Sequence, residues 1–213
     1  MNTKPSKEQI INQAIKFHLQ GNIPEATKYY QYCINQKFQD PRVFSNYGII
    51  LKSFGKLKEA EYLYRKAIEL SPDFVDAYSN LGNIMKDIGK LKEAEYLYRK
   101  AIELNPNLAV AYSNLGNILK DVGKLKEAEY FYRKAIELNP ALADAYSNLG
   151  TLLVDLGKLK EAEYLYRKAI ELNPNLAIAY YSLSLLKYSD QNKIWQDQLF
   201  SANILNKKLP GEQ

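Results

Sequence analysis

One stretch of sixteen residues returns at a fixed interval and constrains the fold of this 213-residue chain more than any other feature. Gly-Lys-Leu-Lys-Glu-Ala-Glu-Tyr-Leu-Tyr-Arg-Lys-Ala-Ile-Glu-Leu begins at Gly55, Gly89 and Gly157, and again at Gly123 with Phe131 replacing one Leu. The interval is 34 residues, the length of two helices and their turns. Such a period predicts one continuous array of stacked helix pairs, in which each pair buries its apolar faces only against its neighbours.

Apolar residues at helical spacing predict both helices of each unit. In residues 75–108 the first helix carries one apolar stripe and the second helix carries another. These stripes are Tyr78, Leu81, Gly82 and Met85, then Ala94, Leu97, Tyr98 and Ala101. Gly82 and Ala94 are small enough to let the two backbones approach closely, with the ring of Tyr98 beside them. Packing therefore explains the repeated Gly, Ala and Tyr without a functional site.

The helix ends are also encoded locally. Gly89 stands where a left-handed residue would end the first helix, because only glycine enters that region without a side-chain clash. Asn105 precedes Pro106, which pushes it out of the helical region and ends the second helix.

These residues resemble the tetratricopeptide repeat. Its pattern of aromatic, Leu-Gly, Gly, Ala, aromatic, Ala and Pro is met by Tyr78, Leu81, Gly82, Gly89, Ala94, Tyr98, Ala101 and Pro106. The resemblance implies an all-α fold, a right-handed superhelical solenoid of antiparallel helix pairs. Four repeats are expected in residues 41–176, namely 41–74, 75–108, 109–142 and 143–176. A degenerate helix pair is expected in residues 1–40, and a divergent capping pair with a tail in residues 177–213, where a last helix over Lys193 to Lys207 carries Trp195.

Composition excludes several classes of function. The net charge is +5, but Glu95, Arg99 and Glu103 follow at four-residue steps, as on a solvated helix face with ion pairs, so no basic stripe for nucleic acid is expected. The chain has one histidine, His18, and one cysteine, Cys33, and it lacks a phosphate loop, a triad or paired carboxylates. We therefore predict no enzyme, no cofactor and no metal site, with Cys33 in a packing role. No apolar run is long enough for a membrane span, which favours a cytoplasmic protein.

Polar residues recur on the opposite face of each first helix. Asp76, Asn80, Asn83 and Asp87 follow at steps of four, three and four, which places them on one face. The candidate peptide-binding residues on this face are Asn46, Asn80, Asn83, Asn114, Asn117 and Asn148. In the resembling family this face lines an inner groove, and an amide offers a donor and an acceptor to the backbone of an extended ligand. The same amides could instead join neighbouring units by hydrogen bonds, and both interpretations stay open.

Three functions are compatible with this pattern. The first is a protein interaction scaffold that binds an extended peptide segment of a partner. The second is the substrate-recruiting repeat region of a longer glycosyltransferase or sulfotransferase, because the aligned Asn residues are similar to the repeat region of O-linked N-acetylglucosamine transferases and bacterial proteins like them. The third is self-assembly into a homo-oligomer through the repeat ends.

Overall fold

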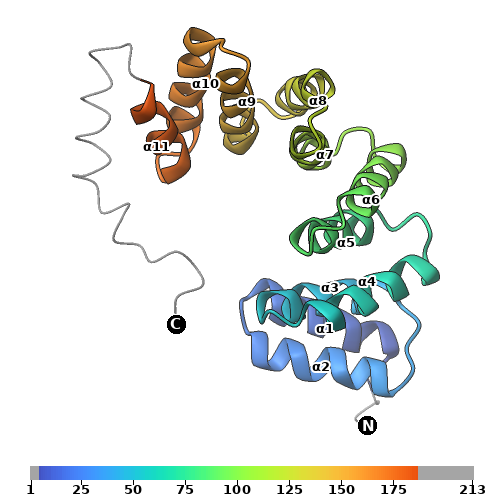
Figure 1. The fold of residues 1–213 in the computed structure, drawn as a ribbon. Coiled ribbons are helices and arrows are strands. Elements are labelled where there is room, and N and C mark those ends of the chain that lie inside the picture. The colour runs from blue at the N-terminus through green and yellow to red at the C-terminus, as the bar shows by residue number, and fades with distance from the viewer. Residues whose placement is uncertain (1–4, 187–213) are drawn as a thin grey trace. The chain divides into compact units, whose positions relative to one another are not determined.

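The computed structural model describes residues 5–186, and every regular element in this range is an α-helix (Figure 1). The helices are α1 Lys7–Leu19, α2 Ile23–Asn35, α3 Pro41–Ser53, α4 Leu57–Leu70, α5 Val75–Asp87, α6 Leu91–Leu104, α7 Ala109–Asp121, α8 Leu125–Leu138, α9 Ala143–Asp155, α10 Leu159–Leu172 and α11 Ala177–Leu185. The predicted all-α fold of paired helices is thus confirmed. None of the described helices is both long and apolar enough to cross a membrane. The helix expected over Lys193 to Lys207, with Trp195, lies outside the described residues.

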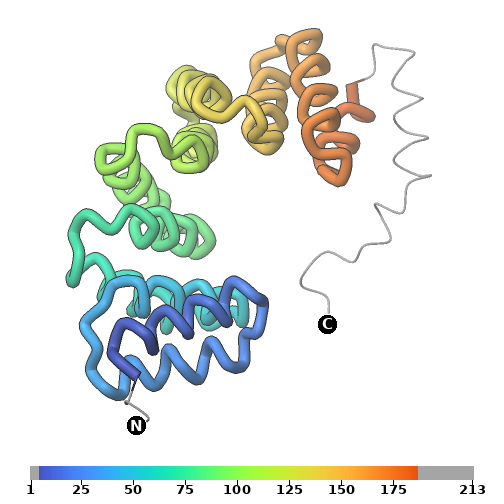
Figure 2. The backbone as a smooth tube through the Cα atoms, turned by 180° about the vertical axis from the view of Figure 1, so that it is seen from behind, coloured from blue at the N-terminus to red at the C-terminus, as the bar shows by residue number. Residues whose placement is uncertain are grey.

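The chain forms two compact units, residues 1–106 and 107–213, with α1 to α6 in the first and α7 to α11 in the second. Within each unit the two helices of a pair are joined by a short turn and pack most extensively against each other (Figure 2). In the first unit α1 contacts α3 and α3 contacts α5, whereas no Cα of α4 lies within 8 Å of a Cα of α6. In the second unit α7, α9 and α11 form the same kind of row. The first helices of the pairs therefore make the more closely packed side of each unit.

A glycine and a tyrosine meet at the centre of each repeated pair. A Cβ atom added to Gly116 in α7 would lie 2.6 Å from Cε1 of Tyr132 in α8. The same atom added to Gly150 would lie 2.8 Å from Cε1 of Tyr166, which is closer than side chains pack in proteins. Tyr132 is fully buried. The expectation that small residues let the paired backbones approach is confirmed.

The turn after each first helix depends on a glycine with positive φ. Gly89 has φ +77°, and its N–H donates to the carbonyl of Lys86 at 2.9 Å, while the N–H of Lys90 donates to the carbonyl of Met85 at 2.8 Å. This pair of bonds is the Schellman motif, which satisfies the last carbonyls of the helix. The second helix ends at Leu104, and Asn105 follows it with an extended backbone before Pro106, as predicted.

Ion pairs connect second helices that do not pack against each other directly. Nη2 of Arg133 in α8 lies 2.7 Å from Glu129 in the same helix and 2.6 Å from Glu161 in α10. In the first unit Arg65 of α4 lies 2.6 Å from Glu93 of α6. These side chains are partly exposed, so each pair contributes about 1 kcal/mol or less.

Candidate functional site

The polar face of the first helices contains a pocket in the second unit. This pocket has a volume of about 290 Å³ and lies between α7 and α9. Its lining residues are Val110, Ser113, Asn114, Asn117, Leu142, Asp144 and Asn148. Three of the six predicted residues, Asn114, Asn117 and Asn148, therefore line one cavity, while Asn46, Asn80 and Asn83 belong to α3 and α5 of the first unit.

One row of the predicted Asn residues binds buried tyrosines. The hydroxyl of Tyr98 donates to Oδ1 of Asn83 at 2.8 Å, and the hydroxyl of Tyr132 donates to Oδ1 of Asn117 at 2.7 Å. Both tyrosines are fully buried, and burial raises their pKa well above the usual value. The amide oxygens of this row thus satisfy hydroxyls that would otherwise be buried without a partner.

The same position holds other residues in the remaining repeats. In α9 it is Thr151, whose Oγ1 accepts a hydrogen bond from the hydroxyl of Tyr166 at 3.1 Å. In α3 it is Ile49, which has no acceptor, and the buried hydroxyl of Tyr64 has no hydrogen-bond partner in the described part of the chain. A sequence signal for this role exists, because each residue of the row stands fifteen positions before its tyrosine.

A second row consists of the Asn residues that precede the Leu-Gly pair. Nδ2 of Asn148 lies 3.4 Å from Oγ of the buried Ser113, a long hydrogen bond that links α9 to α7. Asn46 in α3 acts on the hydroxyl of Tyr30 in α2 and partly offsets the rise that burial causes in its pKa. Asn80 and Asn114 are half-buried on α5 and α7. This row therefore combines contacts between pairs with side chains that reach the surface of the first helices.

Arg42 occupies the polar face of α3 and is held by two carboxylates. Its guanidinium donates to both carboxylate oxygens of Glu8, at 3.1 and 2.9 Å, and to Asp40 at 2.7 Å. The guanidinium lowers the pKa of both Glu8 and Asp40. Because the two carboxylates come from outside α3, Arg42 ties the first helix pair to the second.

His18 and Cys33 lie inside the first helix pair. The structure brings Nδ1 of His18 to 3.5 Å from the hydroxyl of Tyr30, and partial burial lowers the pKa of the imidazole. Cys33 is fully buried, and burial raises the pKa of its thiol to about 11, so its predicted packing role is confirmed. Among residues 5–186 no three His, Cys, Asp or Glu side chains form a group that could hold a metal ion.

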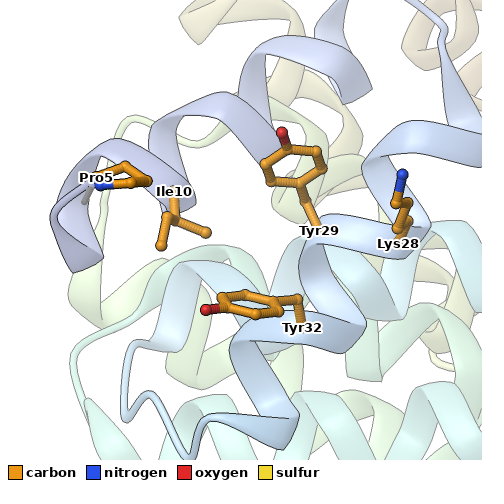
Figure 3. Close-up of a pocket in the computed structure, with 5 residues that line it drawn as sticks. All are labelled: Pro5, Ile10, Lys28, Tyr29 and Tyr32. Carbon is orange, nitrogen blue, oxygen red and sulfur yellow. The ribbon is translucent and has the colours of Figure 1, made fainter. Parts of the chain in front are cut away.

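An apolar pocket lies at the outer surface of α1 and α2. It has a volume of about 270 Å³ and is lined by Pro5, Ile10, Lys28, Tyr29 and Tyr32. Figure 3 shows Tyr29 and Tyr32 on α2 facing Pro5 and Ile10 across it. Sequence reasoning did not identify this pocket, because the lining residues are shared between two helices with the degenerate repeat pattern.

Comparisons with known families and structures indicate one repeat class. Family models described as tetratricopeptide repeat and TPR repeat match residues 75–141 and 108–175, and residues 48–89, respectively. These matches span more than half of the chain. Comparison with curated proteins gives no match.

Solved structures with similar folds include those of MamA, YrrB and PilF. A crystal structure of MamA is 28% identical with a TM-score of 0.58, over 72% of this chain and 88% of that one. YrrB, described as a TPR protein with an unusual peptide-binding site, is 24% identical with a TM-score of 0.62, over 85% of this chain and 94% of that one. PilF of Pseudomonas aeruginosa has a TM-score of 0.80 at 16% identity, over 97% of this chain and 93% of that one. At their low identities, the last two likenesses concern the fold alone.

Proposed function

Because the chain belongs to the tetratricopeptide repeat family, we propose that it is a protein interaction scaffold that binds an extended segment of a partner against its first helices. YrrB, a protein of similar fold, is described as having a peptide-binding site. A cytoplasmic location is part of this proposal.

The observation that carries this proposal is the pocket between α7 and α9. Asn114, Asn117 and Asn148 give it amide groups, and Val110 and Leu142 give it an apolar wall. A carboxamide can donate to a peptide carbonyl and accept from a peptide N–H, so amides that line a pocket suit an extended backbone. The apolar wall suits side chains of the same segment.

The test is a binding comparison with the triple variant Asn80→Ala, Asn114→Ala and Asn148→Ala. These three residues are chosen because Asn83 and Asn117, which accept from the hydroxyls of Tyr98 and Tyr132, stay in place, so helicity is expected to stay nearly unchanged. We expect the wild-type chain to retain partner proteins from a lysate of the source cells and the variant to lose them, as identified by mass spectrometry.

A matched control changes three residues on the second helices: Glu103→Gln, Glu137→Gln and Glu171→Gln. These glutamates occupy equivalent exposed positions on α6, α8 and α10. The control is expected to retain the same partners as the wild type. Equal retention of partners by the Asn variant and the wild type would contradict binding against the first helices. The Asn rows would then have a role in packing only.

A second candidate is a substrate-recruiting region of a longer glycosyltransferase or sulfotransferase. It is favoured by the aligned amides on α7 and α9, which could hold the peptide to be modified. Sequencing the gene in the same reading frame past Gln213 tests this idea. A catalytic domain encoded there would support it, and a stop codon immediately after Gln213 would refute it.

A third candidate is self-assembly through the ends of the array. The apolar pocket of Ile10, Tyr29 and Tyr32 on the outer surface of α1 and α2 favours it. Sedimentation of the wild type and of a Tyr32→Glu variant tests it. A mass that does not depend on concentration in the wild type would contradict self-assembly.

A further inference from the structure

The four repeats differ from one another mainly on their first helices. The second helices α4, α6 and α10 have the same sequence, and α8 differs from them only at Phe131. By contrast, the second residue of the first helix changes in nearly every unit. It is Arg42 in α3, Asp76 in α5, Val110 in α7, Asp144 in α9 and Ile178 in α11. This position therefore varies more from unit to unit than the positions of the packed apolar stripe do.

This variable position lies on the polar face that includes the second Asn row. Val110 is four residues before Asn114, and Asp144 is four residues before Asn148, so each pair lies on the same side of its helix. Val110, Asp144 and Asn148 all line the pocket between α7 and α9. The side chain at this position thus stands where it would contact a segment that the amides hold.

In the second unit the three residues at this position alternate in chemistry. Val110 is 49% exposed, Asp144 is exposed and Ile178 is 54% exposed. Half-exposed aliphatic side chains contribute little to the core, so packing does not account for the choice of Val and Ile. Across α7, α9 and α11 the surface reads apolar, acidic, apolar.

Asp144 is the one charged side chain that lines the pocket. Within residues 5–186 no lysine or arginine forms an ion pair with it. An acidic residue in the first turn also favours a helix through the helix dipole, but α7 and α11 have Val and Ile at the same place and are helical without it. The carboxylate therefore gives this surface a preference for a cation.

Resting on the function proposed above, we propose that α7, α9 and α11 select an extended segment in which a lysine or arginine is flanked, three residues away on each side, by apolar residues. Asp144 pairs with the cation, and Val110 and Ile178 contact the two apolar side chains. Asn114 and Asn148 hold the backbone between them.

The spacing follows from the dimensions of the two partners. Packed helices lie about 8 to 10 Å apart, and an extended chain advances about 3.3 Å per residue, so each first helix meets roughly every third residue of the segment. The sequence apolar, basic, apolar is the same in both directions. The preference therefore holds whichever way the segment runs along the unit.

The first test selects random twelve-residue peptides displayed on phage against the full chain, after removal of peptides that bind the triple Asn variant. We expect recovered sequences to share a basic residue with an apolar residue three positions away on each side. Recovered sequences without this pattern would overturn the inference and leave the proposed function standing. Failure to enrich any sequence over the triple variant would overturn both.

The second test exchanges charge between the chain and a recovered peptide. Asp144→Asn is expected to weaken binding about threefold to fivefold, as measured by fluorescence anisotropy, because an exposed ion pair is worth up to about 1 kcal/mol. Asp144→Lys is expected to reverse the preference, so that the peptide with glutamate in place of its basic residue binds more tightly than the original. Glu137→Gln on α8 removes the same charge from the opposite side of the unit and is expected to leave binding unchanged.

Either of two results would refute the role of Asp144. One is that Asp144→Lys keeps the preference for the basic peptide. The other is that Glu137→Gln weakens binding as much as Asp144→Asn does. The loss of binding would then come from the change in the net charge of the chain and not from a contact with Asp144.

Discussion

At the scale of single residues, the hydroxyl of Tyr64 departs from the pattern of the other repeats, because it is buried without a hydrogen-bond partner in the described part of the chain. Tyr98 and Tyr132 donate to an Asn, whereas Tyr64 is buried opposite Ile49 and its hydroxyl finds no acceptor in the described structure. Ile49→Asn should therefore stabilise the protein by about 1 kcal/mol, because it supplies the missing hydrogen bond while replacing a side chain that is already 39% exposed. Unfolding in urea measures the change.

Two tyrosine variants provide the control. Tyr64→Phe removes a hydroxyl without a partner and is expected to leave the free energy of unfolding unchanged or raise it. Tyr98→Phe removes a hydroxyl that is bonded to Asn83 and is expected to cost about 1 kcal/mol. Equal losses from the two variants would show that Tyr64 is not the exception that the geometry indicates.

Single residues also show where sequence reasoning reaches its limit. The positive φ of Gly89 could be predicted, because glycine enters the left-handed region without a side-chain clash. The different roles of Asn80 and Asn83 do not follow from the helix face on which both lie. The hydrogen bond that Asn83 accepts from the hydroxyl of Tyr98 identifies it as the residue that supports packing.

At the scale of the helix, the ion pairs of Arg133 connect α8 to α10 with no contact between their backbones. Arg133→Met is expected to cost about 1 kcal/mol or less at low salt, because it removes pairs with both Glu129 and Glu161. The cost should disappear near about 1 M salt, where the Debye length falls to about 3 Å. Thermal or urea unfolding at the two salt concentrations measures it.

Lys168→Met is the matched variant, since it removes the same charge from a pair within α10, with Glu171. We expect a smaller, similarly screened loss of a few tenths of a kcal/mol. A cost of Arg133→Met that persists at high salt would mean that the buried part of the side chain, rather than its charge, stabilises the protein.

The helices themselves were largely predictable. The two helices predicted in residues 75–108 are present as α5, Val75–Asp87, and α6, Leu91–Leu104. Apolar spacing and local caps decide these boundaries, so the bounds of each helix can be predicted from its own sequence. The pocket of Tyr29 and Tyr32 was not readable in this way, because it requires two helices to be placed side by side.

For the whole molecule, the buried tyrosines predict sensitivity to alkaline pH. Burial raises the pKa of Tyr64, Tyr98 and Tyr132 in the folded chain, and that of Tyr30 and Tyr166 as well. Their contribution to stability is complete below the pKa of an unfolded tyrosine, about 10. Above it, the unfolded chain releases protons that the folded chain retains, so stability falls by up to about 1.4 kcal/mol per pH unit for each tyrosine.

We therefore expect cooperative unfolding at alkaline pH. Far-ultraviolet ellipticity and tyrosinate absorbance, followed together, should show part of the ionisation coinciding with the loss of helix. Complete ionisation of the tyrosines in a chain that remains helical would contradict the burial of their hydroxyls.

The division into two compact units was not predictable from the sequence. Asn105, Pro106 and Leu108 at the boundary match Asn173, Pro174 and Leu176 within the second unit, so nothing in the period distinguishes the boundary from an ordinary junction between repeats. A repeat pattern gives every junction between neighbouring repeats the same residues, so it does not indicate at which junction the chain divides into compact units.

The second helices α4, α6 and α10 have identical sequences while the first helices vary, and this has a consequence for how the gene can change. Because gene segments that encode identical helices can misalign during recombination, whole units of 34 residues can be duplicated or deleted in frame. Each such event would add or remove one helix pair with its packing surfaces complete, together with one variable side chain on the polar face. The chain could in this way change the length and order of what it recognises in single genetic steps, without a new core having to evolve.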